Sequence, residues 1–176
     1  MEFKLTKIAL TILAGITALT ILSANADEGD DSFAPGGTAI DLHAMQFHNL
    51  KIVMDLKART PAELAFGATI AARIMTHPNT HLAIVIEGPA ISVFAKKNYL
   101  DHQGIVDTWV ALAQKGVHVE YCGNSVHGAG LAPDDMTGLS KDNPAVVNPG
   151  AFPSIANYEA QGYGLVIPMV LELPKP

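Results

Sequence analysis

Short apolar runs alternate with longer segments of helical character along most of the chain. Apolar runs at residues 51–56, 82–86, 117–121, 145–148 and 163–167 predict five buried strands. Helices are predicted at residues 61–76, 90–97, 105–115, 123–131 and 152–161, with a further helical turn at 133–136. The first helix has a strong start, with Thr60 as N-cap, Pro61 in the first turn and Glu63 in the capping-box position. This alternation predicts an α/β fold whose parallel sheet is covered by helices on both faces.

The N-terminal segment has the pattern of an export leader. Lys4 and Lys7 precede an apolar run at residues 8–22, and Ser23-Ala24-Asn25-Ala26 ends it with small residues at the spacing of a cleavage site. Residues 1–26 are therefore interpreted as a signal peptide that is cleaved after Ala26, which predicts a periplasmic or secreted protein without a membrane anchor. An uncleaved anchor is the alternative, but the run is short for a span of about 20 residues.

The remaining chain divides into one domain and two tails. Residues 27–50 begin with an acidic, Gly/Pro-bearing stretch and are interpreted as a mobile tail followed by an arm or short strand. Residues 51–168 carry the alternating strands and helices, and residues 169–176 form a C-terminal tail. The net charge of −6 and the absence of a basic cluster argue against nucleic-acid partners and anionic membrane surfaces.

Cys122 is the only cysteine and follows a predicted strand directly. In an exported chain a single cysteine is free, paired with another molecule, modified or bound to metal. The carboxyl ends of parallel strands are where open α/β sheets place their ligand sites, and a helix N-terminus favours the thiolate form. We therefore expect Cys122 to be an accessible, reactive thiol. The alternative is a buried structural thiol, since free cysteines are commonly buried.

The residues around Cys122 suggest how a reactive thiol would be supported. The backbone N–H groups of Gly123 and Asn124 can form an anion-binding nest, and the side chains of Asn124 and Ser125 can donate hydrogen bonds to a thiolate or persulfide. The simpler interpretation is that Asn124 or Ser125 caps the helix that follows, and the two roles are compatible.

Seven histidines and several strand-end carboxylates are further candidates. His127 lies about one helical turn after Cys122, and strand alternation places His118, Glu120 and Cys122 on one face. A nearby histidine would favour the thiolate. Copper or zinc held by Cys122, His127 and His48 is a weaker alternative, because no CxxC spacing occurs and these three residues are not at tight metal-ligand spacing from one another.

Two acidic residues at strand ends are also candidates for proton transfer. Asp55 and Glu87 lie in or directly after the first and second strands, at the edge where Cys122 is expected. Hydrogen bonding to neighbouring loops is the more common role of such residues. No GxGxxG pattern is present, so a nucleotide cofactor is not expected.

Four stretches of the chain form a specific combination: GVHVEYCGNSVHGAGL, the following Asp135-Met136, VVNPGAFPSI and YEAQGYGLVIP. On these residues the chain from 51 to 168 resembles the DsrE/DsrF-like family, which includes sulfur-relay subunits of the TusD type. The resemblance implies a three-layer α/β/α domain with a five-stranded parallel sheet, assembled as a dimer, trimer or hexamer. In sulfur-relay members the matching cysteine carries a persulfide and passes sulfur to a partner, and by position that residue is Cys122.

Two functions are therefore expected from the sequence. The first is an exported sulfur carrier or sulfurtransferase that exchanges sulfur through Cys122 with a donor or acceptor protein or a small sulfur compound, without a cofactor. The second is a non-catalytic module of the same fold that binds a metal ion or small ligand.

Overall fold

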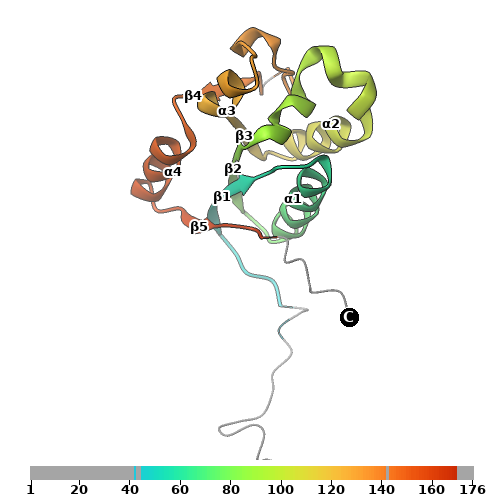
Figure 1. The fold of residues 1–176 in the computed structure, drawn as a ribbon. Helices are drawn as coiled ribbons and strands as arrows, with labels where there is room; N and C mark the ends of the chain where they lie inside the picture. The colour runs from blue at the N-terminus through green and yellow to red at the C-terminus, as the bar shows by residue number, and fades with distance from the viewer. Residues whose placement is uncertain (1–41, 43–44, 142, 170–176) are drawn as a thin grey trace, which may run out of the picture. The chain divides into compact units, whose positions relative to one another are not determined.

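A computed structural model describes residues 42, 45–141 and 143–169, and the five predicted strands form one sheet (Figure 1). The strands are β1 (Lys51–Lys57), β2 (His81–Glu87), β3 (His118–Cys122), β4 (Val146–Asn148) and β5 (Gly164–Val166). All neighbours pair in parallel, in the order β4-β3-β2-β1-β5. The predicted α/β fold with a five-stranded parallel sheet is confirmed.

Parts of the predicted domain organisation lie outside the described residues. These parts are the predicted signal peptide, most of residues 27–50 and all but the first residue of the C-terminal tail. The described residues 45–50 precede β1 without helix or strand. No helix in the described ranges combines the length and apolar character needed to cross a bilayer.

Helices connect the strands. They are α1 (Pro61–Ile74), α2 (Tyr99–Gln114), α3 (Gly123–Gly128) and α4 (Ala151–Ala160), with 3-10 helices η2 (Pro89–Phe94), η3 (Lys96–Asn98) and η4 (Pro133–Asp135). At the start of α1, Thr60 accepts a hydrogen bond from the backbone N–H of Glu63, and the Glu63 carboxylate accepts from the N–H of Thr60. This reciprocal pair satisfies two backbone donors and is the predicted capping box.

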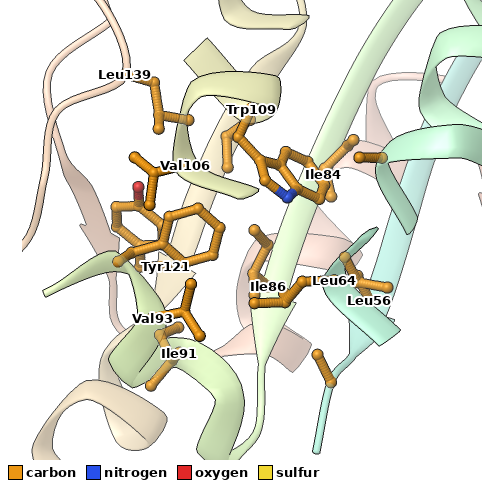
Figure 2. Close-up of a cluster of buried hydrophobic side chains, with 14 of the residues drawn as sticks. Leu56, Leu64, Ile84, Ile86, Ile91, Val93, Val106, Trp109, Tyr121 and Leu139 are labelled. Carbon is orange, nitrogen blue, oxygen red and sulfur yellow. The ribbon is translucent and has the colours of Figure 1, made fainter. Parts of the chain in front are cut away.

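The larger core lies between the sheet and the layer that contains α1 and α2 (Figure 2). Ile84 and Ile86 of β2 point into it, and α2 contributes Trp109, which is completely buried. The Trp109 ring packs edge-on against Phe94, with 6.1 Å between ring centroids. Aromatic side chains bury large apolar areas, so this layer supplies most of the hydrophobic stabilisation of the domain.

The opposite face of the sheet is covered by α4, which packs on β1 and β2 (Figure 1). Its core is small: Val53, Ala83, Val85 and Cys122 from the sheet and Ala151 and Ile155 from α4. The helix enters after Gly150, at φ 142°, and is followed by Gly162, at φ 84°. Both backbone conformations favour glycine, so the chain turns sharply at each end of α4.

Three connections differ from the sequence-based expectation. The single helix predicted at 90–97 is instead the two 3-10 helices η2 and η3, because Pro89 starts a tight turn and Ala95 has an extended backbone. The helix predicted at 105–115 begins earlier, at Tyr99, with non-helical angles at His102. The helix predicted to reach residue 131 ends at Gly128.

Candidate functional site

Cys122 ends β3 and is the N-cap residue of α3, so its predicted place at the carboxyl end of the third strand is confirmed. Its exposed fraction is 2%. The thiol packs in the smaller core, where Ala151 and Ile155 of α4 belong to the same cluster. The expectation of an accessible thiol is therefore not met by this conformation, which matches the buried-thiol alternative. A reagent reaches the sulfur only after its cover has moved.

The helix after Cys122 is shorter than predicted. It has six residues, and its end coincides with the sequence Gly128-Ala129-Gly130, in which Gly130 has φ 69°. Glycine disfavours helix continuation, which accounts for the early stop. Fewer aligned peptide dipoles remain, so the predicted electrostatic support for a thiolate is smaller than a long helix would give.

Gly123 is required by close packing between α3 and β4. A Cβ atom at this position would overlap the backbone carbonyl oxygen of Asn148, the last residue of β4. Because the obstructing atom belongs to the backbone, no side-chain rotation can relieve the overlap. The glycine after the cysteine therefore allows β4 to lie directly against the start of α3.

Asn124 and Ser125 contact neighbouring loops. The Asn124 side chain is exposed and its amide nitrogen lies against Gly150. The Ser125 hydroxyl accepts a hydrogen bond of 2.9 Å from the backbone N–H of Gly88, after β2. The suggested side-chain cap of α3 is not formed, because Cys122 is the N-cap and makes no capping bond. Ser125 instead joins α3 to the end of β2.

A surface cavity of about 470 Å³ adjoins this connection. Its walls come from η2 and the loop before it and from α3 and the residue after it: Gly88, Pro89, Ser92, Ser125, Gly128 and Ala129. Small and polar side chains line it, and none of these residues carries a charge.

Glu120 forms a buried polar network next to Cys122. As alternation predicts, the two side chains share the sheet face that α4 covers, and Glu120 is 8% exposed. Its carboxylate accepts hydrogen bonds from Asn148 Nδ2 at 2.7 Å, from Tyr158 Oη at 2.7 Å and from Ser154 Oγ. His118 Nε2 lies 3.3 Å from Glu120 Oε1. One carboxylate thus connects β3, β4 and α4.

The electrostatics of Glu120 follow from these contacts. Burial acts to raise the pKa of Glu120, but the hydrogen bonds from His118, Ser154, Asn148 and Tyr158 favour the charged form and lower this pKa to about 2. Burial and the hydrogen bond to the Glu120 carboxylate also raise the pKa of the Tyr158 hydroxyl. The network therefore holds an ionised carboxylate whose lone pairs are well satisfied.

Sequence reasoning recognised the shared face of Glu120 but missed its partners Asn148, Ser154 and Tyr158. They lie 28 to 38 residues further along the chain, so no local pattern joins them. The available signal was the carboxylate itself, at a strand position that faces a helix. Such a group needs buried donors when it is removed from water.

The candidate metal ligands are not brought together. His127 is exposed on α3, whereas Cys122 is buried beneath α4. His48 precedes β1, at the amino end of the sheet, and Cys122 lies at the carboxyl end. Among the side chains described, no group of three His, Cys, Asp or Glu residues lies close enough to hold a metal ion. His118, for its part, bonds to Glu120.

A charged cluster lies at the carboxyl ends of β1 and β2 and consists of Asp55, Lys57 and Glu87. It contains the two strand-end carboxylates that are candidates for proton transfer. Lys57 Nζ lies 3.1 Å from Glu87 Oε1 and 3.5 Å from Asp55 Oδ2. Asp55 is 3% exposed, and its Oδ1 has no hydrogen-bond partner among the described residues. Burial, followed by the charge of Glu87, raises the pKa of Asp55. Both carboxylates therefore pair with the Lys57 ammonium, which differs from the hydrogen bonding to neighbouring loops expected as the more common role of these residues.

Comparison with known proteins agrees with this geometry. The sequence model of the DsrE/DsrF-like family matches residues 50–168. A protein of unknown function from Methanobacterium thermoautotrophicum, MTH1491, has a similar structure, with a TM-score of 0.56 and 15% identity over 68% of this chain and 99% of its own. The conserved protein of unknown function BT1422 from Bacteroides thetaiotaomicron gives a TM-score of 0.46 and 17% identity, over 65% of this chain and 93% of its own.

No curated protein matches the sequence. The likeness to MTH1491 shows the fold alone, and the family is established by the match to its sequence model over most of the chain. That match covers every strand of the sheet, Cys122 and the network around Glu120. The chain belongs to the DsrE/DsrF-like family.

Proposed function

We propose that this protein is a thiol-based sulfur carrier that uses Cys122. The proposal is supported by membership of a family associated with sulfur relay and by one structural observation. This observation is the position of the only cysteine, at the carboxyl end of a central strand, where ligands bind in open α/β sheets.

The proposed chemistry requires only the thiolate of Cys122. It attacks the outer sulfur of a sulfane donor R–S–S⁻, so that a Cys122 Sγ–S bond forms, the donor S–S bond breaks and the thiolate R–S⁻ leaves. An acceptor thiolate then attacks the outer sulfur of the Cys122 persulfide and returns Cys122 to the thiolate. Sulfur is transferred without net oxidation, and neither a metal ion nor a second cysteine in this chain takes part.

The donor and acceptor are partner proteins or small sulfur compounds. With a protein partner the chain acts as a carrier, whereas with a small acceptor it acts as a sulfurtransferase. We also propose that this exchange takes place in the periplasm or outside the cell, because residues 1–26 have the sequence pattern of a signal peptide. We also propose a homo-oligomer, because α1 exposes Phe66 to 40% and β5 exposes Leu165 to 41%.

Mass spectrometry of the intact protein tests the carrier function. After incubation with polysulfide or thiosulfate and removal of excess reagent, we expect a species heavier by one sulfur atom, about 32 Da. Cys122→Ser must lack this species, and adding a thiol reductant must remove it from the wild type. Failure of the folded wild type to gain the mass, when its thiol is accessible to a small alkylating reagent, would contradict the proposal.

The alternative function, a binding module without sulfur chemistry, is favoured by the cavity beside α3. Small-ligand binding there would involve Ser125 and the loop at Gly88, and would not require the buried thiol. Isothermal titration with copper and with zinc tests the metal-binding form of this alternative. Saturable binding that persists in Cys122→Ser, together with an absence of persulfide, would favour it.

A further inference from the structure

The cover over Cys122 is a helix with few apolar anchors. Figure 1 shows α4 on the side of the sheet opposite α1 and α2. Of its ten residues, only Ala151, Ser154 and Ile155 are buried. Hydrophobic stabilisation scales with the apolar area removed from water, so two buried apolar side chains hold this helix weakly compared with the layer around Trp109.

Polar contacts to Glu120 supply a second attachment. Ser154 and Tyr158 of α4 both donate to this carboxylate, which lies on β3 two residues before Cys122. Hydrogen bonds to a charged acceptor are stronger than those between neutral groups. The strand that bears the thiol thus also bears the group that holds the helix covering it.

The ends of α4 have the geometry of hinges. Gly150 at φ 142° precedes the helix and Gly162 at φ 84° follows it, and only glycine adopts such angles readily. Hinge motions are absorbed by a few residues at the ends of elements. The helix can therefore move while β4 and β5 keep their pairing with the sheet.

We propose that α4 is a lid over Cys122 and that Glu120 is the positioning residue that holds the lid closed. The inference rests on the sulfur-carrier function and specifies how access to the thiol is regulated. When the lid is closed, the thiol or its persulfide is shielded from reductants in solution. When Ser154 and Tyr158 release Glu120, the sulfur becomes open to a donor or acceptor.

Alkylation kinetics under native conditions test the lid. The thiol of the full-length protein is labelled with N-ethylmaleimide, and the rate is followed by mass spectrometry with increasing urea. Local opening exposes little new surface, so the wild-type rate is expected to change little at low urea and to rise steeply only near global unfolding. A rate that follows global unfolding at every urea concentration would overturn the proposal.

Matched tyrosine variants isolate the contact to Glu120. Tyr158→Phe removes a hydroxyl that donates to Glu120 at 2.7 Å, and Tyr99→Phe removes one that donates to Asp107 at 2.9 Å on α2, in the other layer. Loss of a bond to a charged group predicts labelling about tenfold faster in Tyr158→Phe. The rate in Tyr99→Phe should be unchanged. Ser154→Ala, which lacks the other contact from α4, should also label faster than the wild type.

Global stability is measured alongside the rates, because a purely structural role would alter labelling only through global unfolding. Faster labelling at low urea, beyond any change in the unfolding free energy, supports the lid, whereas equal rates in Tyr158→Phe and the wild type overturn it. Polysulfide loading gives a separate result. Rapid alkylation of Tyr158→Phe without persulfide formation would contradict the carrier function and leave the lid standing. Persulfide formation, together with alkylation rates that do not depend on Tyr158 or Ser154, would support the carrier function and overturn the lid.

Discussion

Gly123 and Asn148 are in contact through their backbones, with the carbonyl oxygen of Asn148 occupying the space that a Cβ of residue 123 would need. The first residue of α3 and the last residue of β4 are therefore in close backbone contact beside Cys122. Asn148 also donates its side-chain amide to Glu120. The close approach therefore aligns the thiol-bearing strand end with the polar network.

Gly123→Ala is expected to lower the free energy of unfolding by about 2 kcal/mol or more, because the overlap with a backbone atom forces β4 to shift. Gly128→Ala is the matched control in the same helix, since its added methyl meets open space. The control should be neutral or stabilising by up to about 1 kcal/mol. Urea denaturation measures both, and equal effects would contradict the packing argument.

Acid is expected to weaken the protein through Glu120. Its pKa is lowered from 4.5 to about 2 in the folded state, so its stabilisation is present above pH 4.5 and is lost as the pH falls toward about 2. The shift corresponds to roughly 3 kcal/mol. Chemical denaturation across this pH range, compared with Glu120→Gln, measures the effect.

The difference in stability between wild type and Glu120→Gln isolates this carboxyl from the others that titrate in the same range. We expect this difference to shrink as the pH falls, because protonated Glu120 loses its advantage over the neutral glutamine. A difference that stays constant between pH 4.5 and about 2 would show that Glu120 does not titrate with a lowered pKa.

Asp55→Asn is expected to stabilise the protein at neutral pH by about 1 kcal/mol, because a buried charge with an unpartnered oxygen is replaced by a neutral amide. Since burial and Glu87 raise the pKa of Asp55, the cost of its charge is fully present above the folded pKa. The gain should fall in acid, where Asp55 is protonated. Thermal melts at several pH values test this.

Asp134→Asn is the control for that change, because Asp134 is exposed and its substitution should alter stability by less than about 0.5 kcal/mol. A loss of stability in Asp55→Asn at neutral pH would mean that attraction between Asp55 and Lys57 outweighs the cost of burial.

Ser125→Ala is expected to cost about 1 kcal/mol, because the N–H of Gly88 loses its acceptor. The control is Ser92→Ala, whose hydroxyl donates to the carbonyl oxygen of Pro89 within η2 in a solvent-exposed hydrogen bond. In urea denaturation, the midpoint of Ser125→Ala should be lower than that of Ser92→Ala. Equal midpoints would indicate that water replaces the Ser125 hydroxyl as acceptor without a loss of stability.

The strands and most helices could be predicted because their signals are local. The apolar runs define the sheet. The capping box, which spans only the four residues from Thr60 to Glu63, fixes the start of α1. The position of Cys122 at a strand end followed from the same pattern. Its burial did not, because Ala151 and Ile155, which belong to the same buried cluster, come from a helix about 30 residues later. The partners of Glu120 could not be predicted either, because Asn148, Ser154 and Tyr158 approach this carboxylate only when β4 and α4 pack against the sheet.

The chain has one tryptophan and one cysteine, and the sheet separates them. Trp109 emission responds to the packing of α2 against Phe94, whereas the rate at which a thiol-reactive dye labels Cys122 reports the opening of the layer that contains α4. The wild-type sequence thus provides one residue for an optical measurement in each layer. Any ligand or partner can be assigned to a face of the sheet by which of the two signals it alters.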